Sequence, residues 1–453
     1  MRLGLSILAR GPRFLLGCVW LVTWATVLRA EPETTTPAAR LVGAISDPRL
    51  VELLGDVLER NPELAEARAG EEAALLMPPQ VSSLPDPMAG VTTFVAPPET
   101  RLGPQFVMGV LSQKLPWFGK RRLRGEAARQ HARALSSGVE ARRLHQVTEV
   151  RRLYHEIAFL DALDAILRTD GATLSHYEEL ARARYASGVG MEAGVVKIQA
   201  ELTKVDARRL EAADGRARLL AQLNALRDRP ADTPLPELTL PDVQEIPLDL
   251  ERLRAVASSA RPELEGAQAH IDQAAAEIEL ARKAHRPDVT LGLTYTWVRS
   301  RTDPGAAGLP DNGKDILGVS ASINLPVRKK RIKAGVEQAA KHEWAAREQH
   351  RAVAAGIERL LGELVARARL TWQRLRLLES SLAIQAAQAL SSAEAGYSAG
   401  ALGALDLLDA ERVQLDVKTA VARARADYVI VLARLEGAVG ASLTVQESKG
   451  GSQ

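Results

Sequence analysis

The side chains best suited to chemistry in this 453-residue sequence are its histidines, and their spacing builds no catalytic or metal site. All eight stand singly: His131, His145, His155, His176, His270, His285, His342 and His350. A zinc-protease helix needs a second histidine four residues after the first, and His155-Glu156 lacks it. The glycines of GVGMEAG (188–194) have the wrong spacing for a dinucleotide loop and follow a predicted helix. With no nucleophile elbow or phosphate loop either, we predict no enzyme, no metal site and no cofactor.

Two clusters of basic residues each follow a Leu-Pro pair and begin a predicted long helix. Positive charge at a helix start opposes the macrodipole, so another interaction must favour it. We hypothesise contact with anionic headgroups of the inner leaflet, with two aromatics at the interface; simple solvated charge is the alternative. The residues expected there are Trp117, Phe118, Lys120, Arg121, Arg122, Arg328, Lys329 and Lys330.

The second basic cluster is preceded by two stretches of strict period-two alternation. Residues 289–298 (VTLGLTYTWV) and 316–326 (ILGVSASINLP) each oppose apolar residues to Thr, Ser, Gly and Asn. Their length of about ten residues suits a tilted transmembrane strand. Standing alone, such a hairpin would more often be half-buried on a soluble core.

The hairpin does not stand alone, because the chain is a tandem repeat. Matching segments lie 200 to 212 residues apart: NPEL (61–64) and RPEL (261–264), PD (85–86) and PD (287–288), KLPWFGKRRL (114–123) and NLPVRKKRI (324–332), YASG (185–188) and YSAG (397–400). The Pro-rich segment 228–247 reads as an extended connector. Each repeat therefore reads as short helix, strand, outer loop, strand, long helix, glycine turn and returning helix.

The predicted long helices span Trp117–Tyr185 and Lys329–Tyr397, with no internal proline. The first of these helices carries two apolar seams side by side. Two seams predict neighbouring helices on both sides, as in a helical barrel or bundle. The first seam holds Leu144, Val147, Tyr154 and Ala158, and the second holds Leu153, Ile157, Leu160 and Leu167. A further helix is expected from Pro48 until Pro78-Pro79 stops it.

The first thirty residues read as a secretory signal peptide cut after Ala30, with a short membrane anchor as the alternative. They contain four arginines and no acid, so the formal net charge of +3 falls to about −1 without them, and nucleic acid is not an expected partner. Cys18, the one cysteine, lies in this leader, and lipidation there is a second alternative. The predicted domains are the signal peptide 1–30, a flexible segment 31–47, the first repeat 48–227, the connector 228–247, the second repeat 248–440 and a polar tail 441–453.

Four strands per chain cannot close a membrane sheet, whose open edges would leave backbone groups unpaired. Several chains are therefore needed. With its doubled strands, basic turns and the turn YSAGALGALDLLDAE (397–411), the mature chain resembles the outer membrane efflux protein family, the TolC-type channels. The resemblance implies a mainly α fold with membrane β-hairpins: a homotrimer with a 12-stranded β-barrel in the outer membrane of a Gram-negative bacterium and an α-helical barrel in the periplasm.

The same resemblance implies partners and sites. The partners would be a periplasmic adaptor (membrane fusion) protein, an inner-membrane pump of the resistance-nodulation-division type, and outer-membrane lipid. Asp406 and Asp409 would ring a periplasmic aperture, the alternative being solvated residues at a helix start. The tips that face the adaptor would hold Tyr185, Gly188, Gly194, Tyr397 and Gly400, with Gly194 standing where the family usually has an acid.

Three functions remain open at this point: an export channel, a periplasmic coiled-coil adaptor or scaffold, and a secreted helical enzyme. An adaptor would need a lipoyl-like or barrel domain between its helical arms, whereas this chain doubles its hairpins. The enzyme lacks any acid–base or nucleophile cluster. For the channel, the segments PDPM (85–88) and GKRRLRGEA (119–127) resemble members linked to heavy-metal or multidrug pumps, so metal ions or drugs are the expected cargo.

Overall fold

The computed structural model describes residues 36–306 and 308–443. Contacts divide the chain into two units, Met1–Thr36 and Pro37–Gln453, and the architecture below is that of the second. The predicted signal peptide, Cys18 and most of the polar tail lie outside the described residues. Within the described ranges, no helix combines the length and the apolar character needed to cross a membrane.

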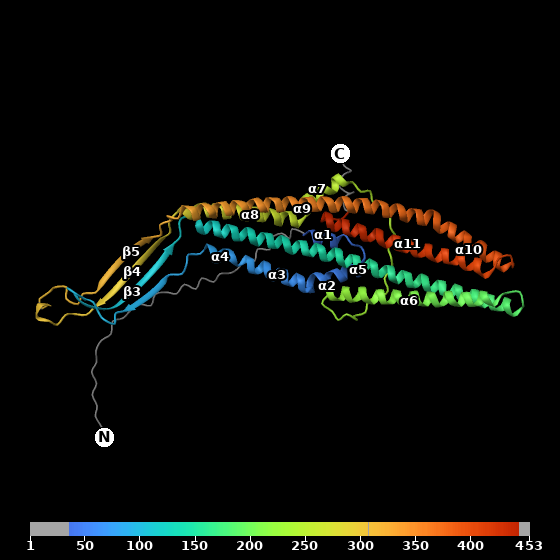
Figure 1. Cartoon of the computed structure of the whole chain (residues 1–453), viewed down its shortest axis with the longest axis horizontal. Coiled ribbons are helices and arrows are strands. Elements are labelled where there is room, and N and C mark those ends of the chain that lie inside the picture. Colours follow the sequence, from blue (N-terminus) through green and yellow to red (C-terminus); the bar gives the residue numbers. More distant parts are fainter. Residues whose placement is uncertain (1–35, 307, 444–453) are drawn as a thin grey trace, which may run out of the picture. The chain divides into compact units, whose positions relative to one another are not determined.

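The second unit is mainly helical with one small sheet, as predicted (Figure 1). Its helices are α1 (Pro37–Gly43), α2 (Pro48–Arg60), α3 (Pro62–Leu75), α4 (Met77–Ser82), α5 (Lys120–Ala186), α6 (Glu192–Leu226), α7 (Leu250–Ala260), α8 (Pro262–Arg282), α9 (Lys329–Leu377), α10 (Ala383–Ser398) and α11 (Ala404–Val439). The strands are β1 (Met88–Thr93), β2 (Glu99–Thr100), β3 (Gly103–Leu115), β4 (Val289–Val298) and β5 (Ile316–Ile323). Short turns of helix lie at Lys283–His285, Pro304–Ala306 and Leu378–Leu382.

The sheet is antiparallel, with the order β1-β3-β4-β5, and the short β2 pairs with β3. Each repeat contributes one hairpin, β1 with β3 and β4 with β5, and β3 pairs with β4 where the repeats meet. Leu293 of β4 lies opposite both Leu111 of β3 and Val319 of β5. Opposed residues in a ladder share a face, so apolar residues from these strands form one continuous surface.

That apolar surface is exposed, whereas on β4 the face of small polar residues is the more covered one. On β4, Leu293, Tyr295 and Trp297 are 44%, 50% and 52% exposed, while Thr296 on the opposite face is 6% exposed. A sheet on a soluble core shows the reverse arrangement, since burial of apolar area drives its packing. The alternative of a hairpin half-buried on a soluble core is therefore wrong for the described chain.

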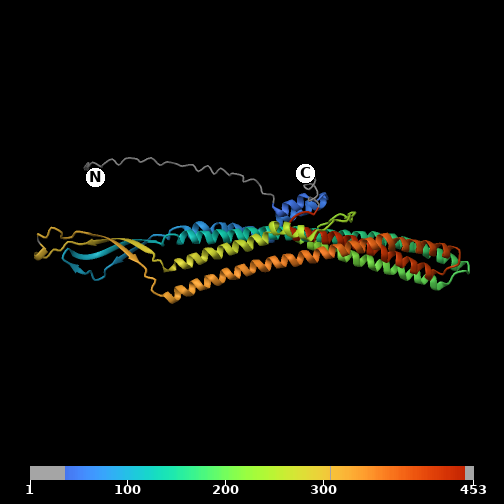
Figure 2. The ribbon, with the colours of Figure 1, turned by 90° about the horizontal axis from the view of Figure 1, so that it is seen from above.

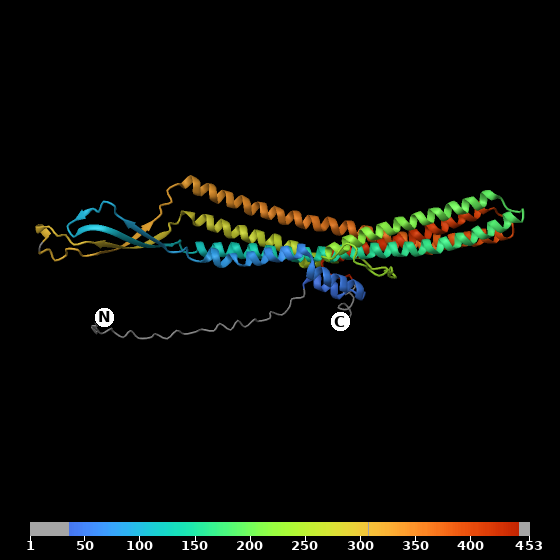
Figure 3. The same cartoon turned by 90° about the horizontal axis from the view of Figure 1, so that it is seen from below.

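The helices nearest the sheet follow the order of the strands. α4 leads into β1, β3 into α5, α8 into β4, and β5 into α9, while α4 packs on α5, α5 on α8 and α8 on α9. Figures 2 and 3 show α9 beside α8, on the side away from α5. Within this unit the sheet lies at one end of the long helices, and the α5–α6 and α10–α11 turns lie at the other (Figure 1).

Both predicted seams of the first long helix are packed. Leu153 and Ile157 of α5 are fully buried in a cluster with Leu54 and Val57 of α2 and Leu223 of α6. Farther from the sheet, a second cluster joins α5, α6, α10 and α11. The two-sided packing expected of a helix in a bundle is confirmed, and the helix runs for 67 residues, on the order of 100 Å.

Two expectations for the N-terminal region were wrong. The flexible segment predicted at 31–47 contains α1, because Ala38 and Leu41 are buried in the first cluster. The single helix expected from Pro48 is three helices. Asn61 adopts an extended ψ before Pro62 and accepts a hydrogen bond from Leu64 N at 3.1 Å, which ends α2 and caps α3. Pro78 and Pro79 begin α4 rather than stop a helix.

The second long helix is also divided, by a π-helical turn at Leu378–Leu382 between α9 and α10. There Ser380 Oγ donates to the Arg376 carbonyl at 2.6 Å, and Arg425 of α11 donates to Glu379 at 2.7 Å. A π turn inserts one residue into the helical repeat and so rotates the faces beyond it. No proline or glycine marks the site, so the local sequence pattern does not predict it.

We predict that Leu153→Ala lowers the free energy of unfolding by about 2–5 kcal/mol, because it opens a cavity between α5 and its neighbours. Leu210→Ala, the same change at a side chain of α6 that is 73% exposed, should cost clearly less. Urea unfolding followed by circular dichroism compares the two variants. Equal losses would contradict the packing described for α5.

Candidate channel elements: the helix–sheet junction and the glycine turns

One buried ion pair fastens the helices to the sheet. Lys120, the first residue of α5, donates from Nζ to Asp288 Oδ1 at 2.8 Å and to the Arg286 carbonyl at 2.7 Å. The backbone N–H of Trp117 donates to the same carboxylate at 3.0 Å. Asp288 directly precedes β4, so this contact holds the start of the first repeat's long helix against the start of the second repeat's first strand.

The environment of Asp288 favours its ionised form. Burial raises the pKa of Asp288, but the hydrogen bonds from Lys120 and Trp117 outweigh that effect and leave the pKa below its usual value. The side chains of Lys120 and Asp288 are only 8% and 12% exposed, so neither charge could be left unpaired without a large penalty.

This pairing contradicts the predicted contact of Lys120 with lipid headgroups, since its ammonium group is turned into the protein. Arg121 is partly covered, and Trp117 lies beneath the Arg286 guanidinium, 5.8 Å from its ring centroid. The other predicted interface residues are exposed: Phe118, Arg122, Arg328, Lys329 and Lys330. For these five, contact with headgroups stays a prediction.

The two glycine turns have nearly the same geometry. Gly188 and Gly400 adopt φ of +76° and +79°, the left-handed region that a side chain rarely occupies. After Gly188, the N–H groups of Val189 and Gly190 bind the Arg184 carbonyl; after Gly400, Ala401 and Leu402 bind the Gly396 carbonyl. These bonds satisfy the last carbonyls of α5 and α10 and turn the chain back.

Arg184 holds the two turns together. Its guanidinium lies over the Tyr397 ring, 4.7 Å from the centroid, and donates to the Tyr397 carbonyl. Tyr397 is buried by this contact, whereas Tyr185 is half exposed. The sequence named the two tyrosines but missed Arg184, because the partner lies 213 positions away.

The two predicted aperture carboxylates are exposed and lie at the start of α11. Asp406 accepts a hydrogen bond from Gly403 N at 3.0 Å, and Asp409 pairs with Arg412 at 3.2 Å. Arg412 also binds Glu201 of α6. Within one chain these aspartates therefore cap and brace a helix start, which was the alternative given for them, and the aperture stays a prediction.

Gly194 stands at the position in the first turn that corresponds to Asp406, and its lack of a side chain has a structural role. A Cβ at Gly194 would lie 3.1 Å from Ala404 Cβ, so the start of α6 approaches the start of α11 closely. A side chain there would be in tight contact with Ala404, so one of the two helices would have to shift slightly. Arg184 with Tyr397, and Arg412 with Glu201, join the turns instead.

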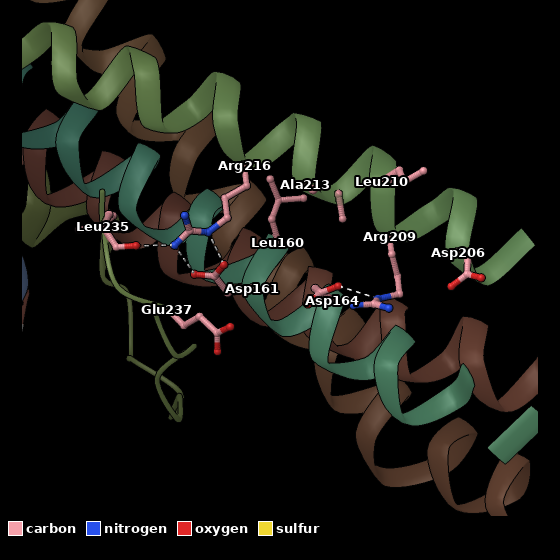
Figure 4. Close-up of a pocket in the computed structure, with 11 residues that line it drawn as sticks. Leu160, Asp161, Asp164, Asp206, Arg209, Leu210, Ala213, Arg216, Leu235 and Glu237 are labelled. Atoms are coloured by element: carbon pink, nitrogen blue, oxygen red, sulfur yellow. Dashed lines mark hydrogen bonds and ion pairs between the residues drawn. The ribbon is translucent and has the colours of Figure 1, made fainter. Parts of the chain in front are cut away.

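Ion pairs also line a hollow between α5 and α6 (Figure 4). Arg216 donates to Asp161 at 2.6 Å and to the Leu235 carbonyl at 2.9 Å, and Arg209 donates to Asp164 at 3.0 Å. Through Arg216, these contacts hold the connector (228–247) against α5 and α6. In the described part of the chain, no group of three His, Cys, Asp or Glu side chains is arranged to hold a metal ion.

Comparison with known families decides the assignment. Residues 253–441 match the model of the outer membrane efflux protein family. We call this matched part of the chain the efflux protein domain. It holds α8 to α11 with β4 and β5, and the resemblance predicted from the sequence is confirmed.

The efflux protein domain and the first repeat together have the fold of solved outer-membrane channels. The chain is similar to the outer membrane protein VceC of Vibrio cholerae, with 21% identity, a TM-score of 0.74, and coverage of 90% of this chain and 100% of that one. It is similar to the MtrE channel of Neisseria gonorrhoeae in its open state, with 22% identity, a TM-score of 0.71, and coverage of 91% and 94%. The chain is also similar to CusC, with 16% identity, a TM-score of 0.73, and coverage of 88% of this chain and 93% of that one. No curated protein sequence matched.

The efflux protein domain also contains a buried acidic group that sequence reasoning missed. Glu411 of α11 is 4% exposed, beside Asp170 of α5, and each has a buried carboxylate oxygen without a hydrogen-bond partner. Burial raises the pKa of Glu411 to about 8, and Asp170 and Glu394 act in the same direction while Lys418 opposes them. Tyr177 donates its hydroxyl to Glu394 beside this pair. A proton on Glu411 is therefore part of the packed arrangement of the helices.

We predict that Asp288→Asn lowers the free energy of unfolding by about 3–5 kcal/mol, because it leaves the buried Lys120 ammonium without a counter-charge. The matched control is Asp242→Asn, since the Asp242 side chain is fully exposed and pairs with Arg425 at 3.5 Å. Urea unfolding measures both. A loss for Asp288→Asn no greater than for Asp242→Asn would contradict the junction.

A second prediction concerns pH. The folded protein holds the Glu411 proton more tightly than the unfolded chain does, so the stability that this proton provides is full at acidic pH and falls as the pH rises toward about 8. Glu411→Gln should therefore lose less melting temperature than the wild type between about pH 5 and pH 8. Glu179→Gln, at an exposed position of α5, is the control and should follow the wild type. Parallel curves for all three proteins would refute the assignment.

Proposed function

We propose that this chain forms an outer-membrane export channel of a tripartite efflux system. Three copies assemble, and substrates arrive from an inner-membrane pump of the resistance-nodulation-division type through a periplasmic adaptor. The observation that carries the proposal is the exposed apolar face of the sheet, in a chain with an efflux protein domain.

The sheet is the membrane part of this proposal. On β4 and β5 its exposed face carries Leu, Val, Tyr and Trp side chains. Its other face carries mainly Thr, Ser and Gly on these strands, together with Met108 and Val110 of β3 and Ile316 of β5. Such a sheet suits lipid on one side and a water-filled lumen on the other. A periplasmic scaffold gains nothing from exposing this surface, which argues against that alternative.

The helical part is the periplasmic conduit. Its glycine turns lie at the end away from the sheet (Figure 1) and are the proposed docking site for the adaptor, where Tyr185 is half exposed. Asp406 and Asp409 lie at the start of α11 beside these turns, where copies around an axis would present rings of carboxylates. The proposed cargo is metal ions or drugs, selected chiefly by the pump.

The test is to express the chain with its leader in a Gram-negative host, separate the membranes and measure the mass of the extracted complex by light scattering. We expect a particle of about three chains in the outer-membrane fraction, and ion conductance when it is placed in a planar bilayer. A soluble monomer or dimer without conductance would refute the channel.

The aperture generates its own prediction. Replacing both Asp406 and Asp409 by Asn should lower the permeability ratio of K⁺ to Cl⁻ several-fold, because rings of carboxylate attract cations. Asp242→Asn removes an exposed acid of the connector and should leave the ratio unchanged. An unaltered ratio in the double variant would leave these aspartates with capping roles alone.

A further inference from the structure

Two helices, one from each repeat, place an acid at a core position of the contact between them. Asp170 of α5 and Glu411 of α11 each stand three residues after one leucine and four before another. Residues at this spacing share one face of a helix. The leucines belong to the cluster that packs α5, α6, α10 and α11, and they are Leu167, Leu174, Leu408 and Leu415. Both acids therefore occupy positions where a packed core usually has an apolar side chain.

The two acids lie against each other in this core. Asp170 and Glu411 are 6% and 4% exposed, and their carboxyl groups are within hydrogen-bonding reach. Asp170 Oδ2 and Glu411 Oε2 receive no donor from the described residues. Ionised carboxylates only accept hydrogen bonds, so a bond between these two groups requires a proton on one of them. The geometry suits one shared proton and disfavours two negative charges.

The ionisable groups that face Glu411 come from both helices beside it and from α11 itself. Asp170 and Tyr177 lie on α5 and Glu394 lies on α10, and the Tyr177 hydroxyl donates to Glu394. Both carboxyl groups disfavour a charge on Glu411. Lys418, an exposed residue seven positions along α11, favours that charge. Burial and the two acids outweigh the lysine, so the proton stays on the pair.

The charges that α6 brings to the start of α11 are already paired. Glu201 binds Arg412, the residue after Glu411, and also binds Lys204 at 2.8 Å. Arg412 in turn binds Asp409 at 3.2 Å. The hydrogen bond from Arg412 holds the pKa of Glu201 below its usual value. This network therefore stays ionised near neutral pH and does not supply a counter-charge to Glu411.

The first repeat has an amide at the position of Glu411. α6 and α11 start 212 positions apart, and Gln199 and Glu411 are separated by the same interval. Gln199 Nε2 donates to Glu178 of α5 at 2.7 Å. A protonated carboxyl group at 411 can donate to Asp170 in the same way, whereas an ionised one cannot. In both repeats this helical position thus binds α5 through a donor to a carboxylate.

We infer that Asp170 and Glu411 share one proton, and that this proton is a pH-sensitive latch between the long helix of the first repeat and the last helix of the second. While it is present, a hydrogen bond holds α11 against α5. When it leaves, two negative charges face each other in an apolar core, and α11 separates from α5 near the glycine turns. In the channel this loosens the end of the conduit away from the sheet, and that consequence rests on the proposed function.

The direction of the effect follows from where the proton is held more tightly. Burial raises the pKa of Glu411 to about 8 in the packed arrangement, whereas separation from α5 returns the group to water and to its ordinary pKa. Between about pH 5 and pH 8, the separated arrangement therefore gains up to roughly tenfold in population per pH unit. The gain ends above about pH 8, because the carboxyl group is then ionised in both arrangements.

Hydrogen–deuterium exchange of the full chain in detergent tests the latch without reference to conduction. Between about pH 6 and pH 8, exchange in 165–178 and 404–418 should rise at least roughly tenfold beyond the intrinsic chemical increase, and exchange at the start of α5 should not. Glu411→Gln should abolish this extra rise, because its amide donates to Asp170 at every pH. Glu179→Gln, at an exposed position of α5, is the matched control and should behave as the wild type does.

Asp170→Asn supplies a second variant with the same expectation. Its amide can donate to Glu411 when that carboxylate is ionised, so the bond no longer needs a proton and the extra rise should again disappear. If both variants keep the pH dependence of the wild type, the titrating group lies elsewhere and the latch is wrong.

A bound cation is the rival occupant of the pair. Millimolar Mg²⁺ or Ca²⁺ at about pH 8 should leave the fast exchange of the wild type unchanged, because a proton and not a metal ion closes the latch. Recovery of slow exchange on adding either ion, and its loss in Glu411→Gln, would overturn the shared proton in favour of a metal site.

Conductance in planar bilayers separates the latch from the proposed function. The wild type should conduct several-fold more at about pH 8 than at about pH 6, and Glu411→Gln should not. If the chain does not conduct but its exchange depends on Glu411, the latch stands and the channel fails. If it conducts and neither exchange nor conductance depends on Glu411, the channel stands and the latch is refuted.

Discussion

Backbone N–H and C=O groups along an edge strand have no water to bind inside a hydrocarbon layer, and this constraint accounts for much of the architecture. The sheet has two such edges, β1 and β5, and an apolar face that the chain itself leaves exposed. A single copy therefore satisfies neither its edges nor its apolar surface in a membrane. The tandem repeat meets part of this constraint within the chain, because pairing of β3 with β4 joins the two hairpins into one sheet.

The joint extends beyond the sheet, because the helices follow the order of the strands. The Lys120–Asp288 pair lies where both layers meet, and its low exposure makes its geometry strict. A slip in strand register would pull the carboxylate away from the ammonium group. Strand register and helix packing are therefore set together, and this pairing accounts for Lys120 at a helix start that its charge does not favour.

At the far end of the helices, packing rather than backbone pairing sets the structure. Glycine at φ near +76° turns each helix pair, Arg184 joins the two turns, and Gly194 lets α6 approach α11. Below them lies Glu411, a buried acid that is neutral when the helices are packed as they are. This end therefore depends on a few specific contacts and on one proton, whereas the sheet end depends on extended ladders.

The sequence alone determined the elements whose signal is local. Alternation in VTLGLTYTWV predicted a strand, the repeated segments predicted a doubled fold, and the glycine after Tyr-Ala-Ser predicted the turn. Only the tertiary structure decided which face of each strand and helix is covered and by which neighbour. Periodicity shows that Leu293 and Trp297 share a surface but not that the surface is exposed. It shows a basic cluster but not that Lys120 meets a carboxylate 168 positions away. The π turn, the burial of Glu411 and the approach of Ala404 to Gly194 likewise depend on neighbours that are distant in the chain, which local pattern does not specify.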